Sequence, residues 1–142
     1  MSQRDESGLP IEGEYDAVVR MTELSGLEAG EKPFVNVGCE IEIDGAQLSI
    51  FGRIYVTEAA AGMARPSLRA IGWDPDKDLA PLHEDQMVLN GNKVRVKVVH
   101  YSNRNGEVKA KIDRFIPPRI KLEGAVRERV SAAAAAIKNA KG

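Results

Sequence analysis

The sequence has a single cysteine, Cys39, among its 142 residues, so an internal disulfide cannot form. It also has no apolar run approaching the ~20 residues that a membrane-spanning helix needs, and no basic segment followed by an apolar one, as in a secretory leader. Together these absences predict a cytoplasmic protein of the reducing cytosol, with no membrane partner.

Residue types that commonly carry catalysis or bind metals are scarce. The two histidines, His83 and His100, lie far apart in sequence, and Cys39 has no second cysteine to complete a metal-binding pair. Neither a phosphate-binding glycine loop of the Walker or dinucleotide type nor a nucleophile motif occurs. We therefore expect no enzymatic activity, no cofactor and no metal, and we expect Cys39 to be a buried apolar thiol.

One acidic segment has the spacing of a calcium-binding loop. Its first, third, fifth and twelfth positions are Asp74, Asp76, Asp78 and Asp85. Leu79, however, stands where such a loop needs a glycine for its sharp turn, and no flanking pair of helices is indicated. We interpret the segment as an exposed acidic loop, with cation binding as the alternative.

Aromatic residues make up only 5% of the chain, and the formal net charge is −1. That near-neutral total hides a strong asymmetry. Residues 93–114 hold seven basic and two acidic side chains, residues 119–142 hold six and two, and the remainder therefore carries a net charge of −10. A local basic surface attracts an anionic polymer whatever the total charge of the protein, so these segments indicate a polyanionic partner.

The chain length predicts one modest domain. We expect a disordered lead-in over residues 1–12, a folded domain over residues 13–118 and an Ala-rich helical tail over residues 119–142. An apolar stripe on the tail consists of Leu122, Val126, Val130 and Ile137. A helix with such a stripe could dock on the domain, pair with a second copy of the chain, or fray, and these alternatives stay open.

The clearest element is a predicted hairpin that follows a first strand from Tyr15 and a loop over residues 25–33. Apolar residues alternate on both sides of Asp44 and Gly45, a pair typical of a two-residue type I′ turn, so the numbers of paired residues should sum to 89. The buried face then pairs Val35 with Ile54, Cys39 with Ile50 and Ile41 with Leu48. The outer face pairs Phe34 with Tyr55, Asn36 with Arg53 and Gly38 with Phe51.

Residues 58–72 favour a helix by composition, with Pro66 in its first turn and Gly72 at its end. Residues 73–91 are expected to form a long loop. Trp73 at its start is expected to plug one end of the barrel, with a stacking role as the alternative. A second hairpin follows, with a three-residue loop ending at Gly106, so that paired numbers sum to 210. Its outward pairs are Arg95 with Phe115, Lys97 with Asp113, Val99 with Lys111 and Tyr101 with Lys109.

Three strands, a helix and two further strands form the order of the five-stranded oligonucleotide-binding (OB) barrel. The predicted fold is therefore an all-β, five-stranded OB-fold barrel (β-β-β-α-β-β) with an appended C-terminal helix.

Rings and cations gather on the outer faces of both predicted hairpins. This set consists of Phe34, Phe51, Arg53, Tyr55, Arg95, Lys97, Tyr101, Lys109 and Lys111. Single strands of nucleic acid bind to cationic grooves with rings on which bases stack, so we interpret the set as a nucleic-acid-binding surface. The alternative is that the rings cover a second small core beneath the tail or residues 73–91, while the lysines keep an edge strand soluble.

Three short segments resemble a bacteriophage family of small OB-fold proteins of unknown function, similar to single-stranded-DNA-binding proteins of replication and recombination gene clusters. They are Gly13-Glu14-Tyr15, the LRAIGW segment at Leu68 to Trp73, and the LNGNKVRVKV segment at Leu89 to Val98. The resemblance implies an OB fold and a role in phage DNA replication or recombination, within the host cytosol and beside phage replication proteins. Single-stranded-DNA-binding proteins often end in an acidic tail that recruits partners, whereas this tail is basic, which argues against recruitment through it.

Our sequence-based hypothesis is a non-catalytic single-stranded DNA-binding protein, in which rings stack on bases and cations neutralise phosphates. The alternative is a structural or protein-interaction OB module, such as a virion component or adaptor, that binds no nucleic acid.

Overall fold

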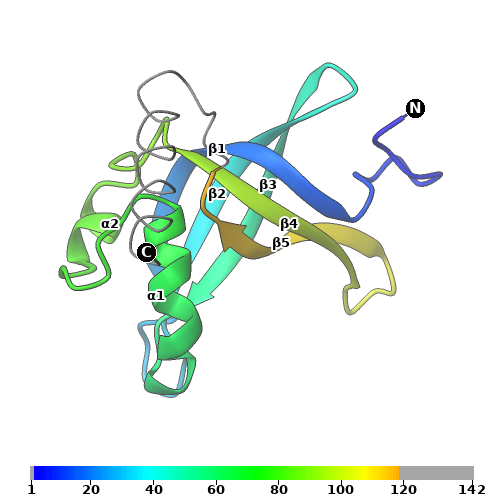
Figure 1. Cartoon of the computed structure of the whole chain (residues 1–142). Coiled ribbons are helices and arrows are strands. Elements are labelled where there is room, and N and C mark those ends of the chain that lie inside the picture. The colour runs from blue at the N-terminus through cyan, green and yellow to red at the C-terminus, as the bar shows by residue number, and fades with distance from the viewer. Residues whose placement is uncertain (1, 119–142) are drawn as a thin grey trace, which may run out of the picture.

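The computed structural model describes residues 2–118, so the expected tail helix lies outside the described residues. Five strands close into a barrel in which hydrogen-bonded neighbours follow the order β1-β2-β3-β5-β4 (Figure 1). The predicted five-stranded barrel, with a helix between its third and fourth strands, is confirmed. Both helices lie at one end of the barrel, while the β2–β3 turn, the β4–β5 turn and the N-terminal segment lie toward the other (Figure 1).

The strands are long and the helices short. The elements are β1 (Gly13–Ser25), β2 (Phe34–Ile43), β3 (Ala46–Tyr55), a 3-10 turn η1 (Glu58–Ala60), α1 (Ala61–Ala70), α2 (Ala80–Glu84), β4 (Lys93–Ser102) and β5 (Val108–Ile116). Strand β1 pairs with β4 from Gly13 to Val18 and with β2 from Ala17 to Ser25, and a bulge at Arg20 shifts its register with β2 by one residue.

The first hairpin has the predicted register throughout. Every pair from Phe34↔Tyr55 to Ile43↔Ala46 sums to 89. The turn residues Asp44 and Gly45 have φ angles of 50° and 82°, as a type I′ turn requires. Alternation along β2 and β3 therefore buries one face of the hairpin in the core and leaves the other face outside.

The second hairpin has the predicted register only near its turn. Pairs from Val98↔Ile112 to Ser102↔Val108 sum to 210, but beyond a bulge the partners become Lys97↔Arg114 and Val96↔Phe115. The predicted pairs of Arg95 with Phe115 and of Lys97 with Asp113 are wrong. The extra residue is Asp113, and because it shifts the alternation by one position, Phe115 is buried rather than outward-facing.

The core fills the barrel with β-branched side chains and closes at the helical end. Fully buried residues include Val19, Val37 and Val96 from the strands and Ile71, which follows α1. Helix α1 ends in a Schellman motif, in which the N–H of Trp73 bonds the carbonyl of Leu68 at 2.9 Å. Trp73 packs partly buried against this core.

Two expectations about the segment between β3 and β4 are wrong. Pro66 lies inside α1 rather than in its first turn, because Thr57 caps η1, with its Oγ1 accepting from Ala60 N at 3.3 Å, and the helix starts early. Residues 73–91 are not simply a long loop, because they contain α2, whose Leu82 is completely buried. Thr22 of β1 donates from its hydroxyl to the Leu82 carbonyl, which ties α2 to the barrel.

The first dozen residues, for which composition predicts a disordered lead-in, make defined contacts with both hairpins. Asp44 accepts hydrogen bonds from Ser2 Oγ and Gln3 N, each at 2.8 Å. Pro10 is buried, and its carbonyl lies 2.7 Å from Nε2 of His100 on β4. Residues 2–12 therefore cross the end of the barrel that carries the two hairpin turns.

Candidate functional site

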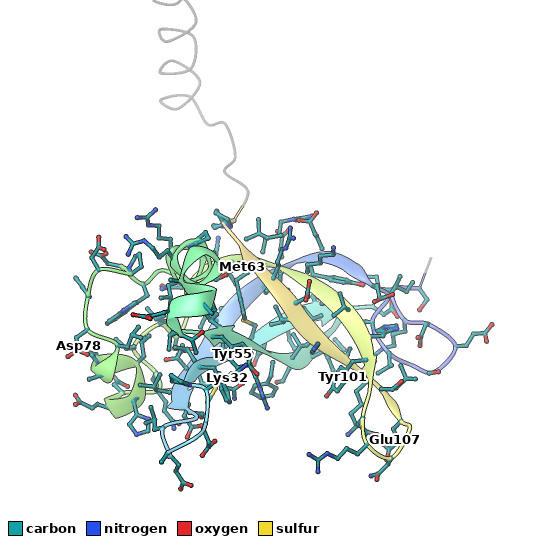
Figure 2. The ribbon with its side chains drawn as sticks, turned by 90° about the horizontal axis from the view of Figure 1, so that it is seen from below. Lys32, Tyr55, Met63, Asp78, Tyr101 and Glu107 are labelled. Atoms are coloured by element: carbon teal, nitrogen blue, oxygen red, sulfur yellow. The ribbon has the colours of Figure 1, made fainter. Side chains whose placement is uncertain are left out.

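A groove of about 620 Å³ runs over the junction of β3, β5 and α1. It lies where the first hairpin meets the second, at the single parallel bridge Gly52↔Ile112 that closes the barrel. Its walls come from β2, β3, α1, β4 and β5, and its lining includes Asn36, Phe51, Arg53, Tyr55, Met63, Ser67, Tyr101, Lys111, Asp113 and Arg114. Figure 2 shows Met63 and Tyr55 on one side of β5 and Tyr101 near the start of that strand.

Five of the nine residues predicted to bind nucleic acid line this groove together. They are Phe51, Arg53 and Tyr55 from the first hairpin and Tyr101 and Lys111 from the second. The two hairpins contribute them because the strand order places β5 beside β3, although residues 56–107 separate these strands in the chain. The groove lining contains no residue from the 73–91 segment, so that segment does not cover the rings as the alternative interpretation supposed.

Phe51 is the most exposed of the aromatic residues that line the groove, with 49% of its surface accessible. Its partner across the hairpin is Gly38, which has no side chain to lift the ring from the sheet. A Cβ atom built on Gly38 would lie 2.8 Å from Cε1 of Phe51 and 2.9 Å from Cγ of Met21. The glycine therefore lets the ring lie close over the backbone of β2, with Met21 beside it.

Tyr55 belongs to a compact group with two other predicted residues. Its ring and the Phe34 ring have centroids 5.4 Å apart, tilted by 52°. The Arg53 guanidinium lies 4.4 Å from the centre of the Phe34 ring and donates from Nη1 to the Tyr55 hydroxyl at 3.3 Å. Phe34 is thus outside the groove lining but holds Arg53 in place through a cation–π contact.

Tyr101 and Lys111 form the corresponding pair on the second hairpin. The Lys111 ammonium lies 5.2 Å from the centre of the Tyr101 ring, within cation–π range. Tyr101 is 38% exposed, so part of the ring stays accessible beside the cation. Each hairpin therefore supplies one tyrosine with a cation next to it.

The other three predicted cations lie outside the groove. Arg95 is engaged by β1, with its Nη1 2.9 Å from Asp16 and its Nε 3.8 Å from Glu14, and its side chain is only 16% exposed. Lys97 stands opposite Glu14 in the β1–β4 pairing. Lys109 is exposed beside Tyr101 but is not part of the lining.

Several lining residues were missed by the sequence-based prediction. Asp113 and Arg114 reach the groove because the bulge leaves two consecutive exposed residues between the buried Ile112 and Phe115. Met63 belongs to α1, whose packing against β3 and β5 the hydrophobic pattern does not reveal. Asn36 could have been predicted as a lining residue, because the predicted register already placed it opposite Arg53 on the outer face.

The other residues that the sequence analysis considered for chemistry are Cys39, the carboxylates of residues 74–85 and the histidines. Burial raises the pKa of the Cys39 thiol to about 12, which makes it a poor nucleophile at neutral pH. The acidic segment uses its carboxylates locally, because Asp74, Asp78 and Asp85 each accept a backbone N–H two residues further on, and Asp76 pairs with Arg65 at 2.8 Å. His83 is exposed in the last turn of α2.

Within residues 2–118, no group of three His, Cys, Asp or Glu side chains is arranged to hold a metal ion. The helices described for this part of the chain are also too short or too polar to cross a membrane. Comparison with protein-family models and with curated proteins finds no match for the chain.

Proposed function

We propose that the protein is a non-catalytic, single-stranded DNA-binding protein of the OB type, and that the groove between the two hairpins is its binding site. The observation that carries the proposal is the composition of the groove, in which Phe51, Tyr55 and Tyr101 share one lining with Arg53, Lys111 and Arg114. Bases stack on such rings, and the cations neutralise phosphates.

The order and position of the elements support the same proposal. OB barrels have five strands in Greek-key connection and bind oligonucleotides on the face of their second and third strands, between two loops. The groove includes part of that face, because Asn36 of β2 and Phe51 to Tyr55 of β3 line it, together with residues of α1, β4 and β5. Figure 2 shows Glu107 of the β4–β5 turn on the same side of the barrel as Tyr101.

A single strand suits this groove better than a duplex does. In a duplex, the bases are paired and stacked on one another, so their faces cannot contact protein rings. A base can stack on the exposed ring of Phe51 or Tyr55 when it is not already stacked between neighbouring base pairs. Arg53 is already held by Phe34 and the Tyr55 hydroxyl, which reduces the conformational entropy lost when it contacts a phosphate.

The biological setting of the proposal rests on the resemblance of Gly13-Glu14-Tyr15, Leu68 to Trp73 and Leu89 to Val98 to the phage family. Under that resemblance, the protein acts in phage DNA replication or recombination.

A second candidate function is a protein-interaction module, and the α1 wall of the groove is the observation that favours it. Met63 is 64% exposed there, and Ala60 of η1 and Ala64 of α1 line the groove with it. An apolar wall of this kind also suits a peptide side chain.

Fluorescence anisotropy of a labelled oligo-dT strand of ~30 nucleotides tests the proposal, since one OB fold covers ~4 to 16 nucleotides. We expect submicromolar affinity at low salt, weaker binding to a duplex of the same length, and a steep loss of affinity between ~50 and ~200 mM salt. Absence of single-strand binding at low salt would refute the proposal and favour the interaction module.

Two cations provide a matched pair of variants for the same assay. Lys111→Ala removes a groove cation and should lower the slope of log affinity against log salt by about 0.7, the value for one phosphate contact on a single strand. Arg95→Ala removes a cation that Asp16 and Glu14 already engage, so the slope should change much less. Equal effects of the two variants would show that long-range charge, rather than the groove, determines affinity.

A further inference from the structure

The bulge in β5 places a carboxylate in a groove whose other charged lining residues are cations. In a regular strand, the residue after the buried Ile112 would face outward and the next would face inward. Here Asp113 is the extra residue of the bulge, so Asp113 and Arg114 are both exposed and both line the groove before Phe115 turns inward. Bulges commonly redirect a side chain next to a functional site.

The carboxylate oxygens of Asp113 are available to accept hydrogen bonds from a ligand. Among residues 2–118, its side chain makes no hydrogen bond or ion pair, although Arg114, Lys111 and Arg53 line the same groove. A carboxylate repels the phosphates of a bound strand, so this position is unfavourable if the groove contacts phosphates alone. The repulsion is offset when the carboxylate accepts hydrogen bonds from a base.

Guanine is the only DNA base with two adjacent hydrogen-bond donors that a single carboxylate can accept. Guanine presents N1–H and the N2 amino group side by side on its Watson–Crick edge, and its O6 beside them accepts a hydrogen bond. Adenine and cytosine present one amino group next to an acceptor nitrogen, and thymine presents a single imide N–H between two carbonyls. An aspartate followed by an arginine on the same wall is complementary to the guanine edge, because arginine is a frequent donor to O6.

We propose that Asp113 makes the groove selective for guanine, with the base stacked on the groove rings, N1–H and N2–H donated to the carboxylate, and Arg114 donating to O6. This inference rests on the proposed single-strand binding and adds a base preference to it. A base stacked on the rings beside Met63 would displace water from the groove, which would strengthen its hydrogen bonds.

The test uses strands of ~12 thymidines in which one central position is thymine, guanine, inosine, adenine or cytosine; a single guanine avoids association of guanine-rich strands. Affinities are measured by anisotropy at one fixed salt concentration. We expect the guanine strand to bind about tenfold or more tightly than the thymine strand, as one bidentate contact provides. Inosine lacks the N2 amino group and should fall between them.

Two variants assign the preference to Asp113. Asp113→Asn replaces one acceptor oxygen by a donor and should abolish the guanine preference, while binding to the thymine strand stays equal or becomes tighter. Glu42→Gln is the matched control, because Glu42 is an exposed carboxylate on β2 outside the groove lining, and this variant should keep the preference. Unchanged melting temperatures would show that both variants fold.

The outcomes separate this inference from the proposed function. Equal affinity for all five strands would overturn the guanine inference and leave single-strand binding intact. A guanine preference that survives in Asp113→Asn would also overturn it, because another group would then read the base. No binding to any strand at low salt would overturn both proposals.

Discussion

The two hairpins of the barrel have similar short turns and yet differ in regularity. The first pairs without interruption from Ile43↔Ala46 to Phe34↔Tyr55, whereas the second loses its initial register after Val98↔Ile112. A turn therefore fixes the register only as far as the first bulge. Beyond it, packing against the rest of the barrel determines which residues face inward.

The packing that controls the second hairpin comes from the first. Phe115 turns inward near Gly52 of β3, and a Cβ on Gly52 would lie 3.0 Å from Cζ of that ring. The absence of a side chain at Gly52 thus makes room for β5, and the bulge at Asp113 brings Phe115 to the correct face. The same bulge places Asp113 and Arg114 in the groove.

The largest expected effect comes from Gly52→Ala, which obstructs the contact between the hairpins. The new Cβ would lie 2.7 Å from Cβ and 2.8 Å from the carbonyl oxygen of Ile112, and backbone cannot move aside as a flexible side chain can. We expect a loss of about 2 kcal/mol in the free energy of unfolding, measured by urea denaturation.

Gly62→Ala is the control for that substitution. Gly62 lies in α1, and a Cβ there meets no atom within 4 Å. Alanine in a helix is favoured over glycine by about 0.5 to 1 kcal/mol, so this variant should gain stability. If both variants unfolded at the wild-type urea concentration, the close approach of β3 and β5 would not limit stability.

An effect of comparable size, on binding rather than on stability, distinguishes the contributions of the two hairpins. Phe51→Ala and Tyr101→Ala each remove one ring, and stacking on one base contributes about 1 to 3 kcal/mol. We expect the larger loss for Phe51, because it is the more exposed ring, whereas Lys111 lies next to the face of Tyr101. Anisotropy with the oligo-dT strand measures both.

Val108→Ala is the matched control for the ring variants, since Val108 is an exposed apolar residue of β5 outside the groove lining. It should bind as the wild type does. Similar losses for all three variants would argue against a specific stacking site.

The smallest effect concerns the turn of the first hairpin. Hydrogen bonds from the Gln3 backbone and the Ser2 hydroxyl, together with the nearby charge of Arg4, lower the pKa of Asp44. The ionised carboxylate therefore stabilises attachment of the N-terminal segment above the unfolded pKa of about 3.9, and this contribution is lost as the pH falls through the lower folded pKa.

Asp44→Asn should consequently speed amide hydrogen exchange in residues 3–11 at neutral pH, while the Asn-Gly pair preserves the type I′ turn. The difference in melting temperature from the wild type should be small and should shrink as the pH falls below 4. Asn103→Ala provides the comparison, because the hydrogen bonds that Asn103 Oδ1 accepts within residues 2–118 come from Asn105 N and Glu107 N in its own turn. A pH-independent difference for Asp44→Asn would contradict the assigned role.

Local sequence patterns predicted much of the fold and part of the candidate site. Alternation and the Asp44-Gly45 pair gave the register of the first hairpin, and hence the outward positions of Phe51, Arg53 and Tyr55. Arg95 was placed on the outer face as well, but its partners Glu14 and Asp16 come from β1, about 80 residues earlier in the chain. No local pattern indicates such a pairing.

The sequence by itself determined the order of the strands, the chemistry of the turns and the inward face of each regular strand, because these depend on residues close together in the chain. Only the tertiary structure decided which rings and cations share one groove, that Leu82 is buried beneath β1, and that Asp113 faces the groove. Those features arise when the barrel closes between Gly52 and Ile112, where the space left by one strand sets the register of another far away in sequence.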